Sequence, residues 1–295
     1  MGRPIILNTS LELSGKVEFF PNCVGENGIE EHFEGVSNRG GGLIGILGGF
    51  DFLASIAANG RFSQVIGLDI NPYQVLVGAI RAGLCHFSST PYDYLTNLLS
   101  LPYDDLDIAD FDDLHDFFWS ASFYDPDNVK MEETWERLEP IFRIEHSASI
   151  GDFRILWEKI FNRYTEFGSK EGLVTRAPVC LDIYRIQDVN LRQSGNSVSW
   201  LASQPNYDWV KSLVQSSRFR LMHGNMLNGG INQAQSCLDD VKFNAMYWSI
   251  FPIPSSNGGL FEDRLNELRG AGVYVAGGYG GKGMTRSGYE QSRMR

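Results

Sequence analysis

The sequence contains no run of apolar residues long enough to span a membrane. A transmembrane helix needs about 20 consecutive apolar residues, and no stretch of the 295-residue chain approaches that length. The opening segment MGRPIILNTSLELSG also lacks the charged start and apolar centre of a signal peptide. We therefore expect a cytoplasmic protein.

Positive charge is also scarce. The chain has 36 acidic and 25 basic residues, a formal net charge of −11 at pH 7, and no basic patch apart from scattered cations at its end. Such a balance repels nucleic acid backbones and anionic membrane surfaces. We expect a small-molecule substrate as the partner, with no nucleic acid and no membrane lipid; the sequence does not indicate an oligomeric state.

The four cysteines show no metal-binding or redox pattern. Cys23, Cys85, Cys180 and Cys237 lie far apart, without a C-x-x-C pair and without histidines at metal-ligand spacing. We interpret them as reduced, mostly buried thiols and predict no metal site.

The hydrophobic pattern predicts an α/β protein. Apolar runs at 43–47 and 65–68 are each followed by a helix-like stretch, which is a βαβα unit. The alternation resumes near 205 with FRLMH, VKFNAMYWSI and GVYVAGG as further strands. These five strands predict a doubly wound, mainly parallel, Rossmann-like sheet with helices on both faces.

The chain divides into four predicted segments. Residues 1–84 hold an N-terminal segment and the first half of the Rossmann-like domain, and 205–280 hold the second half. Between the second and third strands, 85–204 has apolar residues every three or four positions, which predicts a large helical insertion or lid. The glycine-rich residues 281–295 are expected to be a flexible tail.

Two loops at the carboxyl edge of this sheet carry the first chemical signals. Gly48 and Gly49 follow the first strand, where backbone can approach an anionic group beside a helix start. Asp69 ends the second strand about 20 residues later, where an acid accepts the hydroxyls of a nucleoside ribose. The alternatives are a tight turn for the glycines and a helix-capping role for Asp69.

The turn also discriminates between cofactor classes. GILGGFDF lacks the third glycine of G-x-G-x-x-G, which disfavours a dinucleotide, and no G-x-x-x-x-G-K-[ST] occurs. S-adenosylmethionine needs only a helix start for its amino-acid end, an acid for ribose and a polar residue for adenine. Asn225, after the third strand, is the candidate for adenine; alternatively, it is a turn residue.

The sequence DINPYQ at 69–74 resembles the D-x-N-P-x-Q region of the diacylglycerol 3-amino-3-carboxypropyl transferases that make betaine lipids. The upstream turn ILGGFDFLASI is also similar to theirs, and the similarity covers residues 43–100, with only the general layout shared elsewhere. The resemblance implies a class I methyltransferase fold and transfer of the aminocarboxypropyl arm of S-adenosylmethionine, with release of methylthioadenosine. It places Gly48, Gly49, Asp69, Asn71 and Gln74 at the cofactor.

Positioning decides which group such an enzyme transfers. All three carbons on the sulfonium sulfur are electrophilic, so the product depends on which carbon faces the nucleophile. Aromatic faces stabilise a sulfonium as they do other cations, which makes Tyr247, Trp248 and Tyr73 candidates, and Ser249 could position the acceptor. We take Tyr247 and Ser249 as the candidate catalytic residues; the alternative for these side chains is packing in the core.

The acceptor is expected to differ from a lipid, because the chain is acidic and shows no basic amphipathic helix. A small nucleophile fits better, as does the amino group of the cofactor itself, which would close to a cyclic amino acid. Two other functions stay open. One is an ordinary small-molecule methyltransferase, which the fold permits. The other is a non-catalytic cofactor-binding or scaffold protein, suggested by Asn225 in place of an acid.

Overall fold

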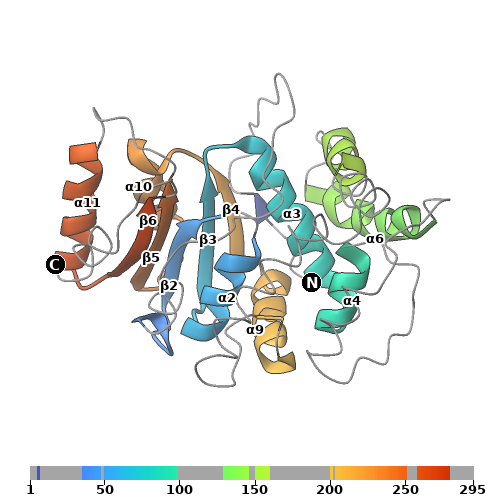
Figure 1. Cartoon of the computed structure of the whole chain (residues 1–295), viewed down its shortest axis with the longest axis horizontal. Coiled ribbons are helices and arrows are strands. Elements are labelled where there is room, and N and C mark those ends of the chain that lie inside the picture. Colours follow the sequence, from blue (N-terminus) through green and yellow to red (C-terminus); the bar gives the residue numbers. More distant parts are fainter. Residues whose placement is uncertain are drawn as a thin grey trace, which may run out of the picture.

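A parallel β-sheet forms the centre of the computed structural model (Figure 1). Its strands are β1 (Ile5–Ile6), β2 (Gly42–Ile46), β3 (Gln64–Asp69), β4 (Phe219–His223), β5 (Phe243–Ile250) and β6 (Tyr274–Tyr279). The residues that the structure describes are 5–6, 35–47, 50–98, 129–145, 150–159, 200–201, 203–250 and 258–279.

The strand order is β1-β4-β3-β2-β5-β6, and every neighbouring pair is parallel. The five strands β2 to β6 are those predicted from the sequence, and their order places the first of them in the middle. This arrangement is that of a Rossmann-like α/β sheet. The two-residue strand β1 was not predicted; it pairs with Arg220 and Leu221 at the edge of the sheet.

The sheet is buried on both faces, which explains why its strands are continuous apolar runs rather than alternating ones. All six residues of β3 are buried. Leu43 and Val65 pack on one face, whereas Ile44 and Ile66 pack in a second cluster on the other.

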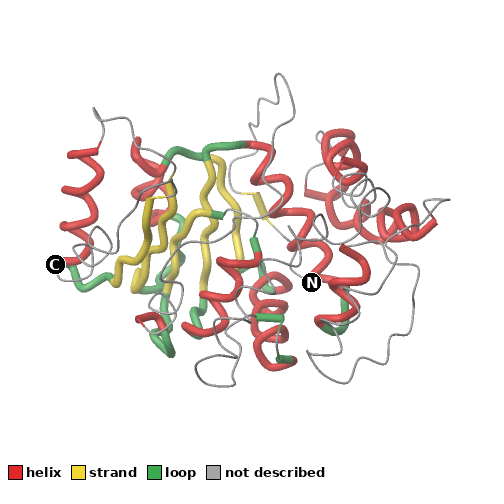
Figure 2. The backbone as a smooth tube through the Cα atoms, viewed as in Figure 1, coloured by secondary structure: helices red, strands yellow, loops and turns green. Residues whose placement is uncertain are grey.

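Helices form a layer on each face (Figures 1 and 2). On the first face, next to the sheet, lie three helices: α2 (Asp51–Gly60), α3 (Pro72–Phe87) and α9 (Gln204–Gln215). Outside α3 lie α4 (Pro91–Leu98), α6 (Val129–Glu145) and a helix at 150–159. The second face carries a π-helical turn, η2 (Met226–Gly230), followed by α10 (Ile231–Ser236) and α11 (Gly258–Gly270).

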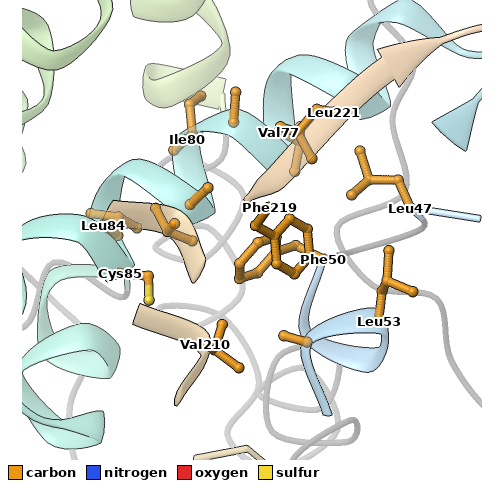
Figure 3. Close-up of a cluster of buried hydrophobic side chains, with 14 of the residues drawn as sticks. Leu47, Phe50, Leu53, Val77, Ile80, Leu84, Cys85, Val210, Phe219 and Leu221 are labelled. Carbon is orange, nitrogen blue, oxygen red and sulfur yellow. The ribbon is translucent and has the colours of Figure 1, made fainter. Parts of the chain in front are cut away.

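The core of the first layer lies between α2, α3, α9 and β4 (Figure 3). Phe50, Val77, Val210 and Phe219 are all buried in it. Helix α3 approaches the segment after β2 closely: a Cβ on Gly78 would lie 2.6 Å from a methyl carbon of Leu47. The small residue at this position therefore sets how near α3 lies to the loop that follows β2.

Parts of the predicted segment 85–204 lie among the described residues. Within 85–204, the segments α4, α6 and 150–159 are helical, as their spacing predicted. Helix α6 continues through Pro140. The predicted tail 281–295 lies outside the described residues.

Candidate functional site

The strand order reverses direction between β2 and β5. From β2 the chain proceeds through β3 to β4 on one side, and then crosses to β5 on the other. In doubly wound sheets, ligands bind beyond the carboxyl ends of the strands at such a switch point. A ligand is therefore expected near the loops after β2 and β3 and the end of β5.

Asp69 is the last residue of β3 and is 8% exposed. Its Oδ1 accepts the backbone N–H of Asn71 at 2.9 Å, and its carbonyl oxygen accepts the backbone N–H of Gly224 at 2.9 Å. These bonds fix the carboxylate at the carboxyl edge of the sheet, level with His223 in the neighbouring strand. Its position agrees with the edge location predicted for a ribose-binding acid.

Asn71, rather than Asp69, caps helix α3. Its Oδ1 accepts the backbone N–H of Tyr73 at 3.0 Å, and Pro72 occupies the first helical position, where no N–H is needed. The capping role considered for Asp69 is thus filled by its neighbour. Gln74 lies in the first turn of α3 and is 2% exposed. The contacts of Asn71 and Gln74 with a cofactor stay predictions.

The residue that directly precedes α2 has a strained backbone conformation. The backbone N–H of Phe50 donates to the carbonyl of Leu47 at 2.9 Å, and Phe50 has φ 77° and ψ −50°. A bulky residue rarely adopts a positive φ, and such strain persists only where the surroundings enforce it. Here the buried ring of Phe50 packs against Trp200 and Phe219. The predicted Gly48 and Gly49 lie outside the described residues.

A buried polar network begins at the residue after Phe50, and sequence reasoning missed it. Asp51, the first residue of α2, pairs with Arg81 of α3 and accepts a hydrogen bond from Tyr94 Oη at 2.9 Å. Burial raises the pKa of Asp51, opposed by Arg81 and by the hydrogen bond from Tyr94. Burial also raises the pKa of Tyr94, which therefore stays a hydrogen-bond donor. The signal was an arginine in the middle of an otherwise apolar helix.

The edge formed by β3 and β4 presents an apolar side chain next to the acid. Ile70 follows Asp69 and is 63% exposed, and its carbonyl lies 3.0 Å from Nε2 of His223. Asn225 directly precedes the π-helical turn, and its carbonyl accepts the N–H of Gly230 at 2.9 Å. An exposed apolar side chain beside a carboxylate suits a ligand with one flat apolar face and vicinal hydroxyls.

The aromatic pair Tyr247 and Trp248 lies within β5 and is split between the two faces of the sheet. Tyr247 packs in the first layer, its ring centroid 5.0 Å from that of Phe52 in the first turn of α2. Trp248 packs in the second layer against Phe261 of α11, which is the core position given above as the alternative. The backbone of Ser249 pairs with β6, and its side chain lies outside the described residues.

Tyr247 therefore lies at the switch point together with the start of α2. Gly45 of β2 pairs with Gly67 on one side and with Tyr247 on the other, so Tyr247 stands two residues short of the level of Asp69. The two residues are separated by one intervening strand, β2, which amounts to roughly 10 Å across the sheet. Tyr73 is partly buried against the first layer.

No protein-family model and no curated protein matches this chain. Among the described residues, no group of three or more histidine, cysteine or acidic side chains could hold a metal ion. In the same part of the chain, no helix is both long and apolar enough to cross a membrane.

Proposed function

We propose that the chain is an S-adenosylmethionine-dependent transferase with a class I methyltransferase type of fold. The observation that carries the proposal is Asp69, a carboxylate fixed at the carboxyl end of β3 beside the switch point. The exposed Ile70 next to it offers an apolar surface for the adenine. The helices between α3 and α9 would form the insertion that covers the site, in a cytoplasmic protein.

The group we propose to be transferred is the 3-amino-3-carboxypropyl arm. A nucleophile forms a bond to the γ carbon of the arm while the bond from that carbon to sulfur breaks. The electron pair of the broken bond stays on sulfur, so the sulfonium becomes the neutral thioether of methylthioadenosine. The nucleophile releases its proton to water. Apart from the acceptor, this step needs no metal and no second cofactor, only alignment.

The products of an incubation with S-adenosylmethionine and candidate small nucleophiles, separated by liquid chromatography, test this proposal. Methylthioadenosine formed in proportion to enzyme supports it; without any acceptor, it indicates cyclisation of the arm. S-adenosylhomocysteine instead identifies a small-molecule methyltransferase. Binding without either product leaves a non-catalytic cofactor-binding or scaffold protein.

Asp69→Asn tests the ribose contact separately from the fold. The amide oxygen of asparagine still accepts the N–H of Asn71, so the turn is retained while the negative charge is lost. Loss of charge-assisted bonds to two ribose hydroxyls is expected to weaken cofactor binding by about 2–4 kcal/mol. Asp263→Asn, an exposed acid on α11 in the opposite layer, is the matched control and should bind as the wild type does.

A further inference from the structure

The carboxylate of Asp51 points into the protein core although it belongs to the first turn of α2. It forms an ion pair with Arg81, which is 1% exposed, and accepts the hydroxyl hydrogen of Tyr94, which is fully buried. Three helices, α2, α3 and α4, are thereby joined at one point. That point lies one residue after the strained Phe50, in the first turn of α2, where Phe52 packs against Tyr247 of β5.

Stability alone does not account for this arrangement. A buried ion pair contributes no more than well-packed apolar side chains of similar volume, and often less. What charged, directional bonds add is a defined orientation. The ion pair also cancels the charge of the Asp51 carboxylate, which would otherwise oppose an anionic group at the amino end of the helix.

We propose that Asp51 is a positioning residue: held by Arg81 and Tyr94, it sets the first turn of α2 against the aminocarboxypropyl arm of the cofactor. This inference rests on the proposed function. Tyr94 belongs to the helices between β3 and β4. Through Asp51 it thereby contributes to binding of the aminocarboxypropyl arm. The nucleoside half, at Asp69 on the neighbouring strand, is held independently of this network.

Tyr94→Phe tests the proposal with the loss of one hydroxyl group. The ring keeps its contacts with Trp200 and Tyr207, and only the hydrogen bond to Asp51 disappears. Tyr207→Phe is the matched control, because Tyr207 is equally buried in the same aromatic cluster but donates its hydroxyl hydrogen to the carbonyl of Ser88.

Binding of two probes is measured by calorimetry for each variant: S-adenosylmethionine, and methylthioadenosine, which lacks the arm. For Tyr94→Phe we expect about a fivefold to tenfold loss of affinity for S-adenosylmethionine, a fraction of what a full hydrogen bond to a charged group gives. Affinity for methylthioadenosine should change less than about twofold, and Tyr207→Phe should leave both affinities within that range. Arg81→Lys keeps the positive charge but not the planar guanidinium. It should show the same selective loss of affinity for S-adenosylmethionine.

Two results overturn the inference. The first is that Tyr94→Phe lowers the affinity for both probes equally, or that Tyr207→Phe lowers the affinity for S-adenosylmethionine selectively. Either outcome shows that the hydroxyl of Tyr94 has only a structural role. The second is an unchanged ratio of the two affinities in both Tyr94→Phe and Arg81→Lys. If the wild type binds neither probe, the proposed function itself fails and the inference falls with it. Unfolding curves of each variant check that it is folded under the conditions of the binding measurement.

Discussion

Replacing Arg81 by methionine measures what the buried ion pair beneath α2 contributes. The guanidinium of Arg81 pairs with Asp51, and their side chains are 1% and 13% exposed. Methionine is similar in length and uncharged, so the variant removes the cation with little change in packing. It leaves the Asp51 carboxylate buried, with the hydroxyl of Tyr94 among its remaining hydrogen-bond partners.

Removal of one partner from a buried ion pair costs about 3–5 kcal/mol. Solvent screens this pair little, because both side chains are largely enclosed. Asp51 can take up a proton once Arg81 is gone, which limits the loss. We therefore expect the lower end of the range, about 3 kcal/mol near neutral pH. For a chain of this size that is a fall in Tm of roughly 6–12 °C.

The loss should depend on pH in a defined direction. Burial raises the pKa of Asp51 above its usual 3.8, and Arg81 opposes that rise, so the pKa rises further in Arg81→Met. An acid with a raised pKa binds its proton more tightly in the folded protein than in the unfolded chain. The stability it confers is complete below about 3.8 and is lost as the pH rises through the folded pKa. The variant should therefore be less destabilised near pH 5 than near pH 8.

Urea unfolding followed by circular dichroism, for the wild type and the variant at both pH values, gives these free energies. The double variant Asp51→Asn with Arg81→Met should recover at least half of the loss, because a neutral pair of similar volume has no uncompensated charge. A loss below about 1 kcal/mol at both pH values would refute the reasoning. So would a double variant no more stable than the single one.

Three further outcomes follow from the described contacts. Asn71→Ala removes the cap of α3 and should cost about 1 kcal/mol in urea unfolding, whereas Asn71→Ser should cost little. Gly78→Ala places a Cβ 2.6 Å from a leucine methyl carbon and should cost about 1–3 kcal/mol. The same change at Gly151, where nothing lies within 4 Å, should stabilise its helix by about 0.5–1 kcal/mol. Ile70→Ser should weaken methylthioadenosine binding about fivefold in calorimetry without loss of stability. Ile155→Ser changes a second isoleucine that is exposed in the described part of the chain, and it should leave that binding unchanged.

The sheet could be predicted from sequence because each long strand is an apolar run bounded by turn residues. β3 illustrates this: six consecutive buried residues, the last of them Asp69, are followed by a short turn and a capped helix. β1 shows the limit of such reasoning. Two isoleucines without a flanking pattern pair with β4 more than 210 residues away, and only tertiary structure makes them a strand.

The polar network beneath α2 could not be predicted from spacing. Asp51 and Arg81 are 30 residues apart, and their contact depends on how α3 lies relative to the first turn of α2. The sequence does show an arginine among apolar residues, which predicts a buried partner of opposite charge. It does not identify that partner among the 36 acids of the chain.

The D-x-N-P sequence at 69–72 divides into residues that the fold explains and one that it does not. Asn71 caps the helix, and Pro72 fits its first position, so helix initiation accounts for both. Asp69 also contributes a turn, since it accepts the N–H of Asn71, but an asparagine or serine accepts such a bond as well. What helix initiation does not require is a negative charge, 8% exposed at the edge of a buried sheet. A buried charge is costly, and this one stands where parallel sheets bind ligands. The carboxylate of Asp69 is therefore the part of the sequence DINP that indicates a function. Asp69→Asn removes the charge and keeps the turn, so this substitution measures the contribution of the carboxylate to function.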